Sequence, residues 1–351
     1  FQPVMIGEPS IEDTILYNKD GVLKSQNIDP NVIPSIVLPL DGIDNHKILP
    51  KKVIIILHAY YCDLAIEMLG NICELEISLI SQHFNYLEID LVITTDDEEK
   101  KDFLKAWLEN SKLASSLLDV VVVPNRGRNV APFLFACKKY VRDHDVILHL
   151  HTKKSPHDIN LCDWGNYLTN SLIGSMANVK SILAMFDASD LGLVFAGHHK
   201  AVFDLRNWGF DFDKAHEILL KLDINLSIDN ALDFPTGMMF WVRPDAIKPL
   251  LDLEIPQNSF DPEDGQIDGT LGHSIERIMN HIVESQEYKT QSVIAVESLD
   301  EYKGEQVRLS VSNCMSFLKN LKPKLTNIKK SKSIYNNVVQ EIFDVSMARS
   351  S

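Results

Sequence analysis

Four apolar runs rich in β-branched residues, alternating with segments of helical pattern, constrain the fold of this chain more than any other feature. The runs cover residues 53–57, 87–95, 119–123 and 145–151. The segments between them, at about 63–81, 98–114 and 130–143, are predicted to be helices. Strands that alternate with helices at this spacing predict βαβ units, and therefore an α/β fold with a mostly parallel central sheet flanked by helices.

Polar side chains stand at the carboxyl end of each predicted strand. They are His58, Tyr60 and Tyr61; residues 94–97 (TTDD); residues 125–129 (NRGRN); and residues 149–154 (HLHTKK). Ligands of open parallel sheets bind beyond these strand ends. We therefore expect the four polar segments to converge on one crevice.

The two ends of the chain differ from this core. Residues 1–50 carry scattered proline and aspartate without a sustained period, which predicts a mostly irregular lead-in. Beyond residue 160, helices are predicted near 164–187, 212–222 and 267–286, and strands at 191–196 and within 234–241. A chain of 351 residues with this pattern is expected to form one catalytic domain with tails.

The charge and cysteine content disfavour several classes of function. With 34 basic and 49 acidic residues, the formal charge is −15, which argues against a general affinity for nucleic acid. Five scattered cysteines without CxxC spacing argue against a disulfide framework and fit a reducing compartment. No run approaches the roughly 20 apolar residues of a spanning helix, and the start lacks signal-peptide features, so a cytoplasmic location is expected. A first residue other than Met also fits a piece of a longer polypeptide.

The turn at 124–129 (PNRGRN) joins a predicted strand to a predicted helix. Two guanidinium groups, a flexible Gly and the amides of a helix N-terminus meet there, which predicts an anion site. The alternative is that Arg126 and Arg128 cap neighbouring carbonyls or pair with surface acids.

His149 and His151 lie two apart on a predicted strand, so both point to one side, with Lys153 and Lys154 just beyond. One interpretation is that the His and Lys side chains bind a diphosphate directly. A zinc site would need a further ligand such as His157 or Asp96. A third alternative is a His pair that is simply satisfied within the structure.

An acidic group, Asp261, Glu263, Asp264 and Asp268, precedes the predicted helix that carries His273, Glu276 and Arg277. Such carboxylates commonly cap a helix and complement its dipole. The alternative is that one of them is a general base that takes a proton from an acceptor hydroxyl.

Five blocks, in order, resemble one known family. They are HAYY at 58–61, NRGRNVAPFL at 125–134, LHLHTKKS at 148–155, FPTGMMFW at 234–241 and GQIDGTLGHSIER at 265–277. Across about residues 50–290 the chain is similar to the rhamnan synthesis F family of bacterial polysaccharide glycosyltransferases. The resemblance implies a GT-A-like fold at 51–296, with a nucleotide-sugar-binding half at 51–160 and an acceptor half at 161–296. A helical or flexible basic tail would follow at 297–351.

The resemblance also implies an activity. A hexosyltransferase would move a sugar, for example a deoxyhexose such as L-rhamnose from dTDP-L-rhamnose, to a lipid-linked or polysaccharide acceptor in the synthesis of O-antigen or cell-wall polymer. Many GT-A enzymes hold Mg²⁺ or Mn²⁺ with an Asp-x-Asp, but this chain has His149-Leu-His151 there. No cofactor and no metal ligand is therefore firmly predicted, and Asn129 also departs from the Asp of the family pattern.

The predicted site has three parts. Catalytic candidates are Asp268, Glu263 and Asp264, with a base opposite the leaving diphosphate giving inversion. Donor-binding candidates are His58, Tyr60, Asp96, Asn125, Arg126, Arg128, Asn129, His149, His151, Lys153 and Lys154. Acceptor-binding candidates are Trp208, Gly237, His273 and Arg277. Trp208 or Trp241 would stack on a sugar ring, but Trp241 lies in an apolar run and is expected to be a core residue instead.

Two other functions also fit the sequence. The chain could be a catalytically silent carbohydrate- or nucleotide-sugar-binding module of a larger polymerase, or a metal hydrolase that uses the His pair. Six lysines between 319 and 333 are either a solvated tail or a peripheral contact with the anionic inner face of the plasma membrane.

Overall fold

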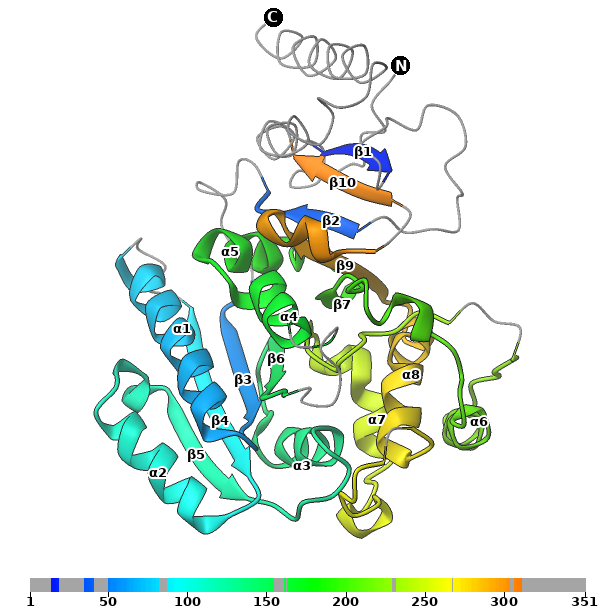
Figure 1. The fold of residues 1–351 in the computed structure, drawn as a ribbon, viewed down its shortest axis with the longest axis horizontal. Coiled ribbons are helices and arrows are strands. Elements are labelled where there is room, and N and C mark those ends of the chain that lie inside the picture. The colour runs from blue at the N-terminus through cyan, green and yellow to red at the C-terminus, as the bar shows by residue number, and fades with distance from the viewer. Residues whose placement is uncertain are drawn as a thin grey trace, which may run out of the picture.

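The computed structural model describes residues 14–18, 35–40, 50–81, 87–154, 161, 163–228, 232–266, 268–303 and 306–310. Within them, ten strands form one sheet in the order β1-β10-β2-β9-β7-β8-β6-β3-β4-β5 (Figure 1). The strands are β1 (Thr14–Asn18), β2 (Ser35–Leu38), β3 (Lys52–His58), β4 (Glu88–Thr95), β5 (Leu117–Val122), β6 (Val146–His151), β7 (Leu191–Ala196), β8 (Phe240–Val242), β9 (Lys289–Ala295) and β10 (Gln306–Ser310).

Parallel pairing dominates the sheet. Strand β3 pairs in parallel with β4 and β6, and β4 pairs in parallel with β5. Strand β8 runs antiparallel to both of its neighbours, β6 and β7, and β1 is antiparallel to β10. The expected α/β fold is therefore confirmed, and a mostly parallel sheet with β8 reversed in its middle is consistent with the GT-A-like arrangement.

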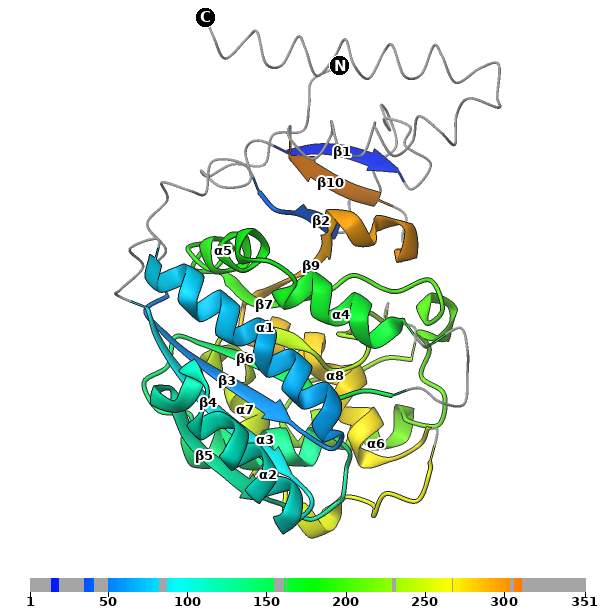
Figure 2. The same cartoon turned by 60° about the vertical axis from the view of Figure 1, so that its left-hand side comes forward.

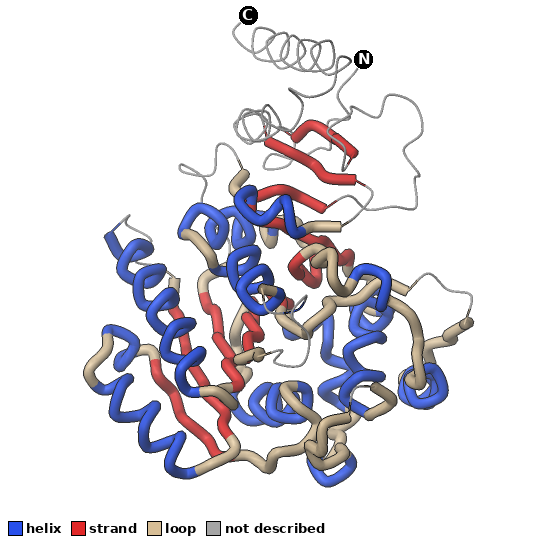
Figure 3. The backbone as a smooth tube through the Cα atoms, viewed as in Figure 1, coloured by secondary structure: helices blue, strands red, loops and turns tan. Residues whose placement is uncertain are grey.

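The helices cover both faces of the sheet, as Figures 2 and 3 show. They are α1 (Cys62–Ser81), α2 (Glu98–Glu109), α3 (Val130–Tyr140), α4 (Trp164–Ile173), α5 (Met176–Met185), α6 (Phe212–Lys221), α7 (Lys248–Asp252) and α8 (Leu271–Ser285). Helices α1, α2, α4 and α5 pack with Ile55 and Leu148 in one apolar core. Helices α3, α6, α7 and α8 pack with Ile54 and Ile147 in the other. Successive strand residues alternate between these cores because side chains alternate faces along a strand.

Local capping explains where the observed helices depart from the predicted ones. The helix predicted at 98–114 ends at Glu109, and a short 3₁₀ turn at Lys112–Ser115 follows, where the Ser111 hydroxyl accepts a hydrogen bond from the Leu113 amide at 3.2 Å. The helix predicted from 267 begins at Leu271, because Thr270 adopts an extended conformation and its Oγ1 accepts from the His273 amide at 3.4 Å. The helices predicted near 164–187 are α4 and α5, and Ser175 caps the second of them.

Strands β1 and β2 come from the segment expected to be an irregular lead-in. Strand β2 is buried and pairs in parallel with β9, so the sheet extends beyond residue 51 toward the N-terminus. The proposed domain boundaries at 50 and 296 stay predictions. The lysines between 319 and 333 lie outside the described residues. In the described part of the chain, every helix is too short or too polar to cross a bilayer.

Candidate functional site

The turn between β5 and α3 is bound directly to the loop that precedes α8. The Gly127 amide donates to the Asp261 carbonyl at 3.1 Å, and the Glu263 amide donates to the Asn125 carbonyl at 3.2 Å. The Arg126 guanidinium donates to the Phe260 carbonyl at 2.7 Å. Gly127 has a φ of 63°, and a Cβ there would lie 2.5 Å from the Phe260 ring. Only glycine permits this approach, which joins the turn after β5 to the loop before α8.

Arg128 is held by the acidic loop. Its amide donates to Glu263 Oε1 at 2.8 Å, and its Nε lies 3.5 Å from Glu263 Oε2. Its guanidinium also donates to the Gln266 carbonyl. Glu263 thus orients Arg128, whereas Asp264 is exposed and its amide donates to the side chain of Gln266 at 3.0 Å.

Two carboxylates, Asp211 and Asp268, share the guanidinium of Arg277. Arg277 lies 2.6 Å from Asp211 Oδ2 and 2.9 Å from Asp268 Oδ1. Arg277 Nε also donates to the Asn207 carbonyl at 2.8 Å, and Ser274 donates to Asp211 Oδ1 at 2.9 Å. Helix α8 thus binds the loop before α6 through the same arginine that neutralises both acids.

The two acids have opposite pKa shifts. Complete burial, together with the hydrogen bond to Asp268, raises the pKa of Asp211 to about 6. For Asp268, burial is opposed by the hydrogen bond from Asp211 and by the charge of Arg277, and the net effect is a pKa below the usual range. Asp268 is therefore the more acidic member of the pair, and it stays ionised to lower pH than Asp211 does.

Lys153 lies within electrostatic reach of Arg128 and Glu276. Burial and the charge of Arg128 lower its pKa to about 8, while Glu276 acts in the opposite direction. Its ammonium group stands 4.0 Å from the centroid of the Trp164 ring. Glu276 accepts a hydrogen bond from the Gly237 amide at 2.8 Å, and burial raises the pKa of this carboxyl. Lys153 thus retains a charge at neutral pH beside a second basic group.

His273 connects these groups electrostatically. Burial and the charge of Arg128 lower its pKa to about 4, with smaller effects from Asp268, Arg277 and Lys153. Its Nδ1 lies 2.8 Å from the hydroxyl of Thr270. The structure therefore brings together Arg128, Lys153, Asp268, His273 and Arg277, all predicted as site residues. They gather beside the turn that Arg126 anchors.

The predicted histidines of the donor site are buried. His58 is 6%, His149 0% and His151 5% exposed. Burial lowers the pKa of His58 to about 4 and that of His151 to about 3, and it lowers that of His149 as well. The His149 ring packs against Phe133 at a centroid distance of 4.3 Å. These rings are therefore neutral, and they contribute to packing but supply no positive charge.

His151 has a supporting contact with the site. Its Nε2 donates to the Gly237 carbonyl at 2.7 Å, while the Gly237 amide binds Glu276. Gly237 has a φ of 87°, and a Cβ there would lie 2.6 Å from Leu168. Gly237 is thus a backbone joint between β6 and α8 and offers no side chain to a ligand.

The other predicted donor residues have partners of their own. Asp96 pairs with Lys100 at 2.6 Å, and the Lys100 ammonium stands 4.2 Å from the Tyr60 ring centroid. Lys154 is exposed and pairs with Asp63 at 2.5 Å. Asn125 is exposed as well, and Asn129 immediately precedes α3 without capping it through its side chain.

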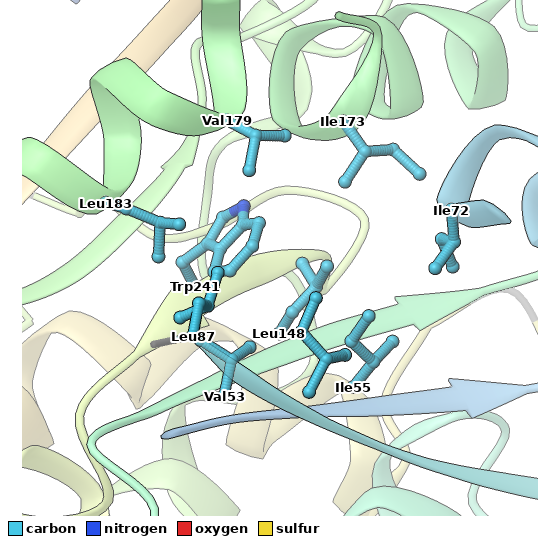
Figure 4. A pocket seen from close by; sticks show the side chains of 10 residues that line it. Val53, Ile55, Ile72, Leu87, Leu148, Ile173, Val179, Leu183 and Trp241 are labelled. Carbon is cyan, nitrogen blue, oxygen red and sulfur yellow. The ribbon is translucent and has the colours of Figure 1, made fainter. Parts of the chain in front are cut away.

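Both tryptophans named for sugar stacking pack against neighbouring residues, Trp208 as a half-buried ring and Trp241 as a buried one. Trp208 packs edge-on against Phe212 at 5.4 Å and stacks on His281 at 6.2 Å between ring centroids. Trp241 is 3% exposed and donates its indole N–H to the Leu172 carbonyl at 3.2 Å. Its ring lines a small apolar cavity with Val53, Leu148 and Val179 (Figure 4). That cavity belongs to the core formed with α1 and α5 and lacks the polar groups that a sugar diphosphate requires.

A divalent cation is the cofactor that a GT-A-like fold suggests. Within the described residues, Asp211, Asp268 and His273 offer ligand atoms that all lie within 4.8 Å of one another. However, Arg277 already places its positive charge against both carboxylates. These side chains therefore do not fit a cation site as they stand, because a cation would have to displace the guanidinium.

Sequence reasoning omitted Asp211 and Glu276 from the predicted site. Asp211 lies just before a helix, where an acid usually caps the helix, yet its side chain is fully buried and faces α8. Glu276 precedes Arg277 on α8 and contacts the Gly237 turn. The one available signal was its place in the GHSIER block, one turn after His273.

Comparison with known proteins identifies the family of this chain. A family model described as rhamnan synthesis protein F matches residues 10–288. Uncharacterized protein WxcX is similar in two strains of Xanthomonas campestris pv. campestris, ATCC 33913 and B100. Each is 29% identical over 248 residues, which cover 70% of this chain. The match covers 33% of each relative, so this chain spans about a third of their length. The extent of the family match shows that the chain belongs to the rhamnan synthesis protein F family.

Proposed function

We propose that this chain is a glycosyltransferase that moves a sugar from a nucleotide diphosphate donor to a growing surface polysaccharide. The proposal rests on membership of a family named for rhamnan synthesis and on an α/β fold that is GT-A-like. The observation that carries it is the grouping of Arg128 and Lys153 with the ionised carboxylate of Asp268 at the start of α8. Positive groups near an acid supply both a diphosphate site and a proton acceptor.

In the proposed reaction, Arg128 and Lys153 hold the donor diphosphate. Their charges stabilise the negative charge that develops on the leaving nucleotide diphosphate as the bond from the anomeric carbon to its phosphate oxygen breaks. The turn that carries Arg128 is fixed by Glu263 and by the backbone bonds to the acidic loop. A fixed turn reduces the reorganisation needed when the donor binds.

Asp268 is the proposed general base. It accepts the proton of the acceptor hydroxyl while the oxygen of that hydroxyl forms the new bond to the anomeric carbon. Glu263 is less suited to this step because it binds Arg128. A base opposite the leaving group gives a single displacement with inversion at the anomeric carbon.

The donor is proposed to carry a deoxyhexose such as L-rhamnose, with dTDP-L-rhamnose as the first candidate. The name of the family, rhamnan synthesis protein F, supports this donor. The acceptor is proposed to be lipid-linked or polymeric.

A panel of nucleotide sugars, each incubated with the chain and octyl α-L-rhamnopyranoside, tests the proposal through release of the nucleotide diphosphate. We expect release with one deoxyhexose donor and little with the others. Parallel reactions with EDTA measure metal dependence, and because Arg277 occupies the two acids we expect activity to persist. Absence of release and of transferred sugar across the panel would contradict the proposed activity.

A second candidate function is a nucleotide-sugar-binding module without transfer. The ion pair between Asp268 and Arg277 favours it, because an acid with a lowered pKa is a weaker base. Calorimetric titration with the donor separates the two functions. Saturable binding together with a complete lack of turnover supports the binding module.

A further inference from the structure

Phe210 has the most exposed large apolar side chain among the described residues, at 84% exposed. It lies in the loop before α6, next to Asp211 and close to Asp268. The Phe210 amide donates to Asp268 Oδ2 at 3.3 Å. A Cβ at Gly269, the residue after Asp268, would lie 3.2 Å from the Phe210 Cβ. The residue whose amide binds the proposed base therefore carries an aromatic ring that is exposed to solvent.

The loop that carries Phe210 is held in place on both sides of this residue. Gly209 has a φ of 50°, and its amide donates to the Asn207 side chain at 2.9 Å. A Cβ at Gly209 would lie 2.0 Å from Asp268 Oδ2, so the loop can approach the acid this closely only with glycine there. Arg277 binds the Asn207 carbonyl and the Asp211 carboxylate. The backbone of the loop is therefore fixed by the same α8 side chains that form the site.

The aromatic residues of this loop alternate in direction. Trp208 packs inward on His281, and Phe212 packs edge-on against Trp208. Phe210, between them, is turned out to solvent. Exposure of one ring on a loop with a fixed backbone leaves an apolar surface, and only the two χ angles of that side chain have to be ordered when a ligand covers it.

We propose that Phe210 is the platform on which the apolar face of an acceptor sugar ring stacks, next to Asp268. This inference rests on the proposed transfer reaction and names a residue that determines its acceptor specificity. The C–H groups on one face of a pyranose ring complement an aromatic face, and a 6-deoxy sugar adds a methyl group to that apolar surface. Stacking there would bring a ring hydroxyl toward the carboxylate that accepts its proton.

Binding can be tested without any transfer. Phe210→Trp adds an indole at the proposed platform, and Phe103→Trp is the matched control, since Phe103 is 53% exposed on α2 at the far end of the sheet (Figure 1). We expect methyl α-L-rhamnopyranoside to change the tryptophan emission of Phe210→Trp in a saturable way, relative to the unmodified chain and to Phe103→Trp. An unchanged emission of Phe210→Trp, with this glycoside and with methyl β-D-glucopyranoside, would overturn the inference.

Kinetics separate the acceptor from the donor. With octyl α-L-rhamnopyranoside as acceptor, Phe210→Ala should raise the KM for the acceptor roughly three- to tenfold and leave the KM for the donor unchanged. Phe210→Trp should restore the acceptor KM, and Phe103→Ala should match the unmodified chain. An unchanged acceptor KM in Phe210→Ala, or an effect on the donor KM alone, would contradict the inference. An emission response without turnover of any donor would support the sugar platform and refute the proposed transferase.

Discussion

The carboxyl ends of β3 and β6 and the first turns of α8 both carry polar side chains, but in opposite electrostatic states. His58, His149 and His151 on the strands are buried and neutral. On and just before α8, Asp268 and Arg277 are partly or largely buried yet paired as ions. A buried group without a counter-ion favours its neutral form, whereas a buried group that is paired with an opposite charge can stay ionised. The chemistry of this domain is thus expected at α8 and at the turn bound to it. The strand histidines support these elements through packing.

The largest expected effect concerns Asp268. Asp268→Asn should reduce transfer roughly 10²- to 10⁴-fold, because it removes the proposed base while keeping the size of the side chain. Nucleotide diphosphate release measures the loss, and calorimetry should show donor binding retained. Asp252→Asn, on α7 in an exposed pair with Lys248, is the control. Unaltered turnover in Asp268→Asn would remove this residue from the mechanism.

Arg277→Met should destabilise the fold by about 3–5 kcal/mol, because two carboxylates at the site lose their counter-ion. Urea denaturation at pH 7 measures the loss. Without the arginine, the pKa values of Asp211 and Asp268 rise in the folded state, so stability is regained as pH falls through them and the deficit should be smaller at pH 5 than at pH 7. The double variant Asp211→Asn with Arg277→Met should recover part of the lost stability. An equal deficit at both pH values would contradict this account of the ion pairs.

The neighbouring lysines provide a matched pair. Lys153→Ala should raise the KM for the donor roughly 10- to 100-fold, as expected for loss of a hydrogen bond between charged groups. Lys154→Ala should change it less than about twofold, because Lys154 is exposed and pairs with Asp63 at the surface. Equal effects of the two substitutions on the donor KM would show that the diphosphate does not bind Lys153 in preference to Lys154.

Because the pKa of Lys153 is about 8, donor affinity is expected to depend on pH. The ammonium form predominates below pH 8 and is lost above it, so donor affinity should fall up to about tenfold between pH 7 and pH 9. In Lys153→Arg, the guanidinium stays charged throughout this range, so donor affinity should not change between pH 7 and pH 9. Parallel profiles for the two proteins would assign the pH dependence to another group.

The smallest effect is expected at the strand histidines. His149→Leu should leave the donor KM within about twofold, because His149 is neutral and packed between Phe133 and Phe240. Its free energy of unfolding should change by less than about 1.5 kcal/mol, as for other core replacements of similar volume. A loss of donor affinity comparable to that of Lys153→Ala would remove the contrast between the two regions.

The sequence predicted some residues of the site for reasons that the structure supports and others for reasons that it does not. Arg128 and Asp268 were found because a strand-to-helix turn and an acidic helix start are local features. Trp208 was named because it is aromatic, yet its ring is packed inward while Phe210, two residues later, is exposed. Local pattern does not tell which residue of an aromatic loop faces solvent, because that depends on what the loop packs against.

The sequence alone determined the α/β class, the strands β3, β4, β6 and β7 and the placement of polar segments at strand ends, because β-branched runs and helical segments are encoded over short distances. Tertiary structure alone decided which polar groups became ions. Asp211 is paired with Arg277, which is 66 residues away in the sequence. The strand histidines are neutral because they are buried between two layers of helices. Charge state depends on solvent exclusion and on partners brought together by folding, and neither can be read from a single segment.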